Sequence, residues 1–161
     1  MDKEEIWKVL STVTDPEIPV ATIVGMGIVR DVEVSPEKVV VTITPTYTGC
    51  PAMEVMEQDI RSALKEAGVL SIEVKLVHAP AWTTDWMTEE TKQELKKYGI
   101  APPKKVSEFD PLVSIGKPEP VACPFCDSLE TERKSQFGST ACKALHVCHH
   151  CNQPFEEFKP F

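Results

Sequence analysis

Two pairs of cysteines near the end of the sequence constrain the fold more than any other feature. Cys123-Pro-Phe-Cys126 and Cys148-His-His-Cys151 are separated by 21 residues. Two such knuckles can bring four thiolates into a tetrahedron, which is the complete ligand set of a structural Zn²⁺ site. The spacing therefore predicts a zinc ribbon in which all four cysteines bind one Zn²⁺. An iron or iron–sulfur site on the same four sulfurs is the alternative.

Two further cysteines, Cys50 and Cys142, lie outside these pairs. Cys142 follows Phe137-Gly-Ser-Thr-Ala and precedes Lys143. Two interpretations of it stay open, a buried ribbon residue and a reactive thiol or transient metal ligand. Six cysteines in a chain that lacks secretory features favour metal or thiol chemistry over disulfides.

Composition limits the classes of function. The 161 residues suffice for one good core and a small module. The net charge is −8 and no stripe of Lys or Arg is present, so we expect no nucleic-acid partner. No apolar run approaches 18 residues, and the first residues lack the basic and apolar regions of a signal peptide. We therefore expect a cytoplasmic protein with no membrane partner.

The first 80 residues follow a clear order of helix and strand patterns. Apolar spacing and a capping box of Asp2 with Glu5 predict a helix over residues 2–13. A strand pair over 28–34 and 39–44, a helix over 51–67 and a strand over 71–78 follow. A right-handed crossover would make the last strand parallel. The fold class is therefore α+β, a compact α-β-β-α-β sheet domain with helices on one face, plus a small C-terminal zinc ribbon.

The rest of the chain divides by composition. We expect an α/β domain over 1–100, a Pro-rich linker over 101–119 and the four-cysteine zinc ribbon over 120–161. Before the linker, Trp82 and Trp86 flank two threonines and an Asp. These aromatics either pack over the sheet or form a loop that docks a partner.

Cys50 stands where the second strand pattern gives way to the second helix pattern. Pro51 suits the first helical position, so Cys50 lies at or next to the N-cap. Backbone N–H groups and the helix dipole favour a thiolate there, although free Cys is also a common core residue. Asp15 and Glu17 occupy a short loop that Pro16 and Pro19 keep out of the helix. They are either solvated turn residues or part of a site.

Asp15-Pro-Glu-Ile-Pro19, together with Thr44-Pro-Thr-Tyr-Thr-Gly-Cys-Pro51, resembles the SufT-like iron–sulfur assembly family over roughly residues 1–80. The resemblance implies a small α/β domain that delivers or matures iron–sulfur clusters. It also implies that Asp15, Glu17 and Cys50 converge and handle iron or a cluster transiently. Cys142 is a further candidate for that role.

Three later stretches carry a second resemblance. They are Pro80-Ala-Trp-Thr-Thr-Asp-Trp86, Phe137-Gly-Ser-Thr-Ala-Cys-Lys-Ala144 and the two cysteine knuckles. Together they resemble the PaaD (PaaJ) family of the bacterial phenylacetyl-CoA epoxidase system of phenylacetate breakdown. The family is named as an oxygenase component, yet this sequence holds no paired Glu-x-x-His set for a di-iron site. It also lacks a G-x-G-x-x-G nucleotide fingerprint.

We therefore expect a non-catalytic accessory protein that matures or delivers the cluster of the iron–sulfur reductase component of the epoxidase. The epoxidase components, most of all that reductase, would be its partners. Two alternatives remain. One is a stable structural subunit of the oxygenase complex that docks through Trp82–Trp86. The other is a small redox protein with an iron site on the four knuckle cysteines.

Overall fold

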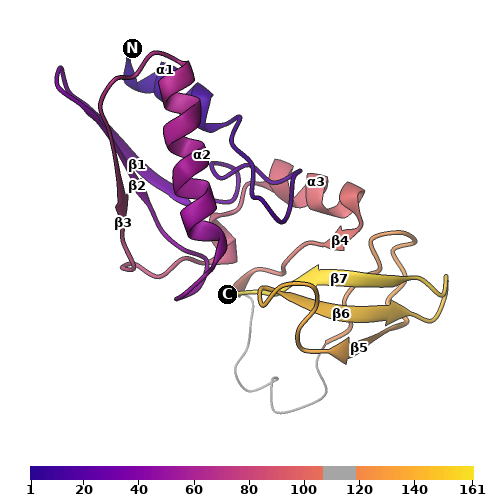
Figure 1. Cartoon of the computed structure of the whole chain (residues 1–161). Coiled ribbons are helices and arrows are strands. Elements are labelled where there is room, and N and C mark those ends of the chain that lie inside the picture. The colour runs from indigo at the N-terminus through magenta and orange to yellow at the C-terminus, as the bar shows by residue number, and fades with distance from the viewer. Residues whose placement is uncertain (107–118) are drawn as a thin grey trace. The chain divides into compact units, whose positions relative to one another are not determined.

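The structure is a computed structural model that describes residues 1–106 and 119–161 (Figure 1). The chain forms two compact units. Unit 1 holds Met1–Trp82 and Trp86–Thr91, and unit 2 holds Thr83–Asp85 and Lys92–Phe161. The three-part division expected from composition remains a prediction. Residues 107–118 of the expected linker lie outside the described residues.

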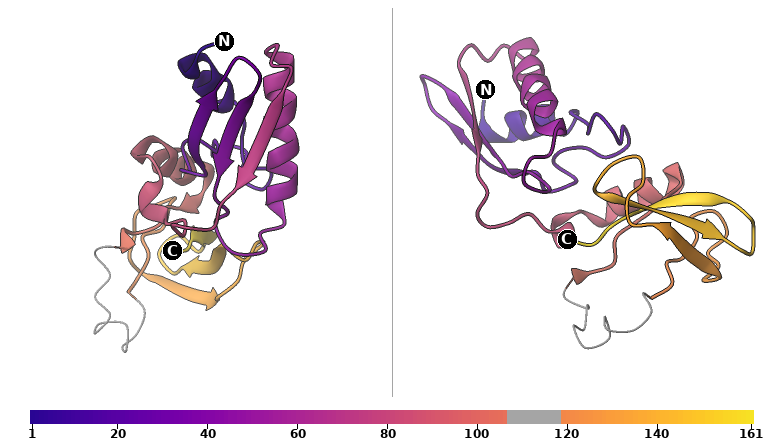
Figure 2. Two further views of the ribbon diagram at one scale, coloured as in Figure 1. Left: turned by 90° about the vertical axis from the view of Figure 1, so that its left-hand side faces the viewer. Right: turned by 60° about the horizontal axis from the view of Figure 1, so that its bottom comes forward.

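Unit 1 has the predicted order of elements, which confirms the α-β-β-α-β prediction. The elements are α1 (Lys3–Leu10), β1 (Val29–Val34), β2 (Val39–Ile43), α2 (Ala52–Glu66) and β3 (Ile72–Leu76). The sheet runs β1-β2-β3, with β1 antiparallel and β3 parallel to β2. Both helices cover one face of this sheet, and α1 contacts both α2 and β1 (Figures 1 and 2).

The apolar residues that predicted the helices form the core of unit 1. Ile6 and Leu10 of α1 and Ile60 and Leu64 of α2 are fully buried. The capping box forms as predicted, since the Asp2 carboxylate accepts a hydrogen bond from the Glu5 N–H at 2.8 Å. This cap fixes where α1 begins.

The two tryptophans after β3 pack within unit 1. Trp82 is 5% exposed, and its indole N–H donates to the Met26 carbonyl at 2.9 Å. The Arg30 guanidinium carbon lies 3.6 Å from the Trp86 ring centroid. Gly27 has φ 71°, and a Cβ there would lie 2.8 Å from the Cβ of Trp86. This close approach requires glycine. These contacts favour packing as the role of the pair.

Unit 2 is built on a second sheet, with strand order β4-β7-β6-β5. The strands of this sheet are β4 (Ile100–Ala101), β5 (Thr131–Ser135), β6 (Lys143–Cys148) and β7 (Pro154–Phe158). Two further elements are shared between the units. Unit 2 contains Thr84 and Asp85 of a 3₁₀ turn (Thr84–Trp86) and the part of α3 (Glu89–Tyr98) from Lys92 onward. The β5–β6 and β6–β7 pairs are antiparallel, whereas β4 is parallel to β7.

Ala101, the first residue of the expected linker, lies in β4. It pairs with Glu157 of β7 and is 1% exposed in a small apolar cluster of the ribbon. Burying one small residue against β7 extends a core that the ribbon alone would leave thin. Within residues 1–106 and 119–161, every helix is too short or too polar to cross a membrane.

Candidate metal centre and thiol sites

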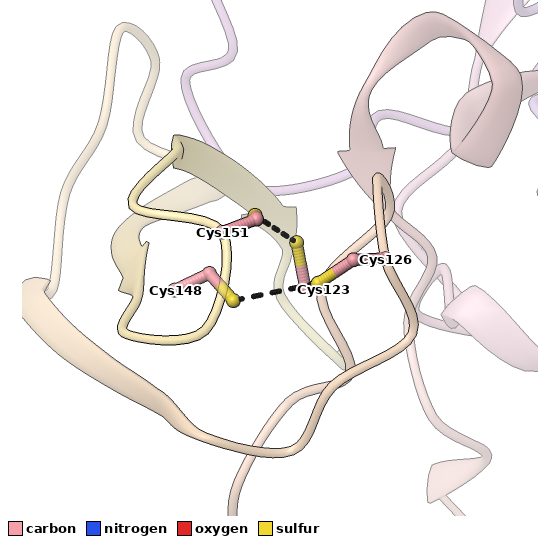
Figure 3. Close-up of side chains that lie close together, drawn as sticks. All are labelled: Cys123, Cys126, Cys148 and Cys151. Carbon is pink, nitrogen blue, oxygen red and sulfur yellow. Dashed lines mark hydrogen bonds between the residues drawn. The ribbon is translucent and has the colours of Figure 1, made fainter.

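The four knuckle cysteines gather at one end of the ribbon (Figure 3). Their sulfur atoms all lie within 4.8 Å of one another. Cys123 Sγ and Cys151 Sγ are 3.7 Å apart, and Cys126 Sγ and Cys148 Sγ are 3.6 Å apart. A tetrahedral Zn²⁺ with Zn–S bonds of about 2.3 Å requires sulfur–sulfur distances of about 3.8 Å. The four side chains therefore fit a metal ion.

The backbone of each knuckle shows why these loops form. Asp127 and Asn152, which directly follow the second cysteine of each pair, have φ of 59° and 58°. Asp and Asn are the side chains that best tolerate this left-handed conformation. The Asp127 N–H then donates to the Cys123 carbonyl at 2.9 Å and closes the first turn. An Asp or Asn after each pair was thus a sequence signal for the knuckle.

The protein favours the thiolate at one of the four sulfurs, Cys148. The backbone N–H of Cys151, with help from that of His150, lowers the pKa of the Cys148 thiol to about 6. Metal ligation requires the thiolate, so these N–H groups reduce the cost of deprotonating this ligand. The backbone N–H of Ser128 lowers the pKa of Cys126, but burial and the neighbouring sulfurs outweigh it and raise this pKa to about 12. Burial also raises the pKa of Cys151.

Cys123 and Cys148 are buried against Phe155 in the small ribbon core. A bound ion would therefore be part of that core.

Cys142 lies in the same unit but is not one of the four gathered cysteines. It is 8% exposed, and its sulfur lies 3.0 Å from the Thr140 hydroxyl. Its carbonyl accepts a hydrogen bond from the Lys159 N–H at 3.0 Å. The structure thus places Cys142 as a buried ribbon residue at a fixed position. Its reactive role stays a prediction.

A carboxylate fixes the loop that leads to Cys142. Glu156 accepts hydrogen bonds from the Ser139 N–H at 2.5 Å and the Ser139 hydroxyl at 3.0 Å, and it pairs with Lys143 at 3.1 Å. Burial raises the pKa of Glu156, but Ser139 and Lys143 outweigh it and hold the pKa below its usual value. A Cβ on Gly138 would meet the Glu156 carboxylate at 2.4 Å, so a larger residue there would displace this carboxylate.

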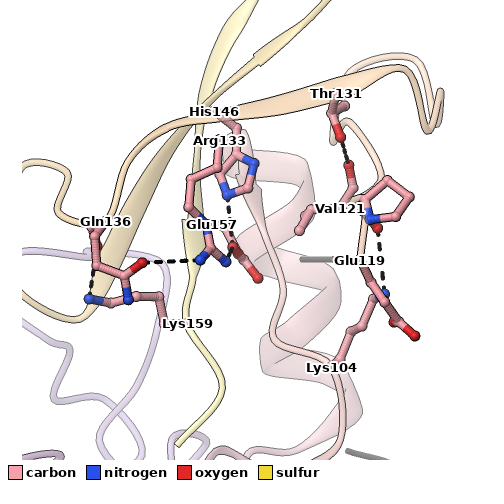
Figure 4. Close-up of polar contacts among 10 residues, drawn as sticks. Lys104, Glu119, Val121, Thr131, Arg133, Gln136, His146, Glu157 and Lys159 are labelled. Carbon is pink, nitrogen blue, oxygen red and sulfur yellow. Dashed lines mark hydrogen bonds and ion pairs between the residues drawn. The ribbon is translucent and has the colours of Figure 1, made fainter. Parts of the chain in front are cut away.

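The neighbouring carboxylate of β7, Glu157, serves a second polar cluster (Figure 4). His146 Nε2 lies 2.8 Å from Glu157 Oε2, and both side chains are buried. Arg133 approaches the same oxygen at 3.5 Å. The His146 ring stacks on Phe155 with centroids 5.3 Å apart. Successive glutamates of β7 therefore pair on opposite faces of the sheet, a role that the sequence pattern did not reveal.

Asp15 and Glu17 have different surroundings. The Asp15 carboxylate is 7% exposed and accepts hydrogen bonds from the N–H groups of Glu17 at 2.7 Å and Ile18 at 2.9 Å. The Asp15 N–H also donates to the Ala21 carbonyl at 2.8 Å. Asp15 thus holds the loop in shape. Glu17 is exposed to solvent.

Cys50 lies directly before the N-cap residue Pro51 of α2, next to the N-cap as predicted. Its N–H donates to the Tyr47 carbonyl at 3.2 Å, and its own carbonyl accepts from the Met53 N–H at 3.3 Å. The half-buried thiol therefore stands at the start of α2 on a turn defined by two hydrogen bonds.

The segment that joins α1 to β1 and carries the acidic loop runs beside the N-terminal half of α2 (Figures 1 and 2). However, among the described residues the four knuckle cysteines are the group of metal-ligating side chains that gathers. Within that part of the chain, Asp15, Glu17 and Cys50 form no second such group. Their joint action on iron or a cluster stays a prediction.

Comparisons with known proteins agree with both units. Residues 3–76 match the family described as "Iron-sulfur cluster assembly protein". Residues 110–159 match "PaaD zinc beta ribbon domain". A solved domain of unknown function from Bacillus anthracis is 31% identical, with a TM-score of 0.54, over 58% of this chain and 90% of its own. Fold and site therefore define an iron–sulfur assembly-type domain followed by a zinc ribbon.

Two similar proteins show to which family within this class the chain belongs. A putative 1,2-phenylacetyl-CoA epoxidase subunit of Escherichia coli (strain K12) is 48% identical over 155 residues, which cover 96% of this chain and 91% of that protein. The chain belongs to the PaaD family. A "Fe-S protein maturation auxiliary factor" of Porphyromonas gingivalis is 37% identical over 95 residues, or 58% of this chain and 90% of that protein.

Proposed function

We propose that this protein is a non-catalytic accessory factor of phenylacetate catabolism. In this proposal it matures or delivers the iron–sulfur cluster of the reductase component of the phenylacetyl-CoA epoxidase. One observation carries the proposal. A single chain joins an assembly-type domain, whose relatives are named maturation factors, to the ribbon of the PaaD family, one of whose members is named an epoxidase subunit. Such a factor would act in the cytoplasm, where its client is made.

The two units would have different tasks. Cys123, Cys126, Cys148 and Cys151 would hold one Zn²⁺ as a closed four-sulfur site, which leaves no position for a substrate. The ion would supply folding free energy to a small core and would need no redox change. Cluster handling would then belong to other thiols.

Cys50 is the first candidate for that handling. A thiolate suits an iron–sulfur cluster, and the half-buried Cys50 stands directly before the first turn of α2. The exposed Glu17 can supply a carboxylate to iron, whereas Asp15 already uses one oxygen to hold the loop. Cys142 is the second candidate thiol, although its burial makes it less accessible.

A specific observation favours a second candidate function. A relative that covers 96% of this chain is named a putative subunit of the epoxidase. A stable structural subunit would remain in stoichiometric complex with the other components and would dock through the Trp82–Trp86 segment. The packing of Trp82 against Met26 leaves little of its indole for such a contact.

Anaerobic purification of the epoxidase components with the untagged chain, followed by metal and sulfide analysis, separates these functions. A maturation factor should carry one zinc per chain and should form no stable complex with the epoxidase components. A stoichiometric complex would establish the subunit role instead. Iron in the four-cysteine site with a visible chromophore would favour a redox protein.

A further inference from the structure

The Trp82–Trp86 segment is held by hydrogen bonds in both units. Trp82 belongs to unit 1 and donates to the Met26 carbonyl at 2.9 Å. The next residues, Thr83 and Thr84, belong to unit 2. The two anchored groups are therefore successive residues, joined by one peptide bond.

Both threonines bind the main chain of Phe161, which follows β7. The Thr83 hydroxyl donates to the Phe161 carbonyl oxygen at 2.6 Å, and the Thr84 N–H donates to the same oxygen at 3.2 Å. In return the Phe161 N–H donates to the Thr84 hydroxyl at 3.3 Å. Thr84 is 1% exposed, so water cannot readily replace these bonds. We call this set of bonds the threonine clamp.

Phe161 of the clamp follows β7 closely in the chain, and β7 begins beside the metal centre. Cys151 is a knuckle residue, and β7 begins three residues later at Pro154. Phe155 of β7 packs in the small cluster that contains Cys123 and Cys148. Without an ion this cluster would hold four repelling or protonated sulfurs around a thin core, so β7 would lose much of its support.

We propose that the Trp82–Trp86 segment couples metal loading of the ribbon to the order of the assembly-type unit. Loaded knuckles fix β7, β7 presents Phe161 to the threonine clamp, and the clamp holds Thr83 beside the Trp82 anchor. The coupling rests on the four-cysteine metal site of the proposed function. The coupling requires no cluster transfer. It also gives a structural role to the Thr83–Thr84 pair, which neither strand nor helix patterns explain.

Hydrogen exchange of the full chain tests the coupling, with the zinc-loaded protein compared with protein stripped by a chelator under reducing, anaerobic conditions. Metal removal should speed exchange of the Thr84 amide and of the Trp82 indole N–H about five- to tenfold or more, since each depends on a bond of ordinary net strength. Thr83→Val in the zinc-loaded protein should speed exchange of the same two protons. Thr12→Val, on the exposed surface of unit 1, is the matched control and should change neither.

The effects of metal removal and of Thr83→Val on the two exchange rates should not be additive, because both changes release the same clamp. Unchanged exchange of both protons after metal removal would overturn the coupling while leaving the zinc site intact. A wild-type chain that takes up no zinc would instead overturn the metal site on which it rests. If Thr83→Val does not fold, Thr84→Val and the metal-free wild-type protein give the same comparison.

Discussion

At the scale of single residues, the structure separates side chains that look alike in the sequence. Asp15 and Glu17 read as one acidic pair, yet the first binds two backbone N–H groups and the second faces solvent. Glu156 and Glu157 are adjacent, yet one fixes the loop before Cys142 and the other pairs with a buried histidine. Such differences depend on which backbone groups lie nearby, so sequence spacing alone could not predict them.

Asp15→Ala should destabilise unit 1 by roughly 2–4 kcal/mol, because two backbone N–H groups lose a charged acceptor in a buried loop. Asp15→Asn keeps an oxygen at that place and should cost about 1 kcal/mol or less. Urea unfolding of the three proteins measures both effects. Equal losses in the two variants would show that the charge, and not the acceptor geometry, supports the loop.

A titration tests the surface electrostatics of unit 1 away from any metal. The Lys3 ammonium binds the Asp31 carboxylate at 2.9 Å and holds the pKa of Asp31 below its usual value. The pair therefore supports the fold above the unfolded pKa of about 3.9, and this support is lost as pH falls through the lower folded pKa. NMR titration should find that Lys3→Met raises the pKa of Asp31. An unchanged pKa in the variant would show that the ion pair does not persist in solution.

At the scale of elements, the sequence predicted most of what periodic patterns can express. The order of α1, β1, β2, α2 and β3 is confirmed, and it was predictable because the two helices have apolar residues at helical spacing and the three strands are rich in β-branched residues. The two-residue strand β4 was not predicted, because two residues carry no period and pair only through β7. The threonine clamp was missed for a related reason, since its hydrogen bonds join positions 77 and 78 residues apart.

Cys148→Ser should abolish metal binding and unfold the β5–β7 ribbon, because three thiolates cannot close a tetrahedral site. The helices and strands of unit 1 should persist, since their core contains none of the four ligands. Metal analysis and circular dichroism measure the two parts. Full zinc content in this variant would refute the ligand set.

Trp82→Ala should destabilise unit 1 by about 3–5 kcal/mol, the usual cost of removing a large buried aromatic. Trp82→Phe keeps a ring but leaves the Met26 carbonyl without its indole donor, so its cost should be about 1–3 kcal/mol. Thermal unfolding checks both. Unchanged melting combined with lost binding to an epoxidase component would make partner docking the main role of Trp82.

At the scale of the whole molecule, the two units suit different chemistry. In the proposed function, the four gathered cysteines hold a permanent structural ion and the single thiol at the start of α2 contacts a cluster transiently. The ribbon site could be predicted from the sequence because its spacing encodes its geometry. Among the residues that the structure describes, Asp15, Glu17 and Cys50 form no such group, so their joint action on iron stays a prediction.

The proposed function depends most on Cys50 helping to load the iron–sulfur reductase of the epoxidase. The direct measurement is iron and sulfide per reductase, purified anaerobically from cells that grow on phenylacetate and carry wild-type or Cys50→Ser protein. The substitution changes one atom of a half-buried side chain, so the fold should survive. We predict an under-filled reductase in the Cys50→Ser cells at normal levels of the accessory protein. A fully loaded reductase and wild-type growth would contradict this role and leave Cys142 as the remaining candidate.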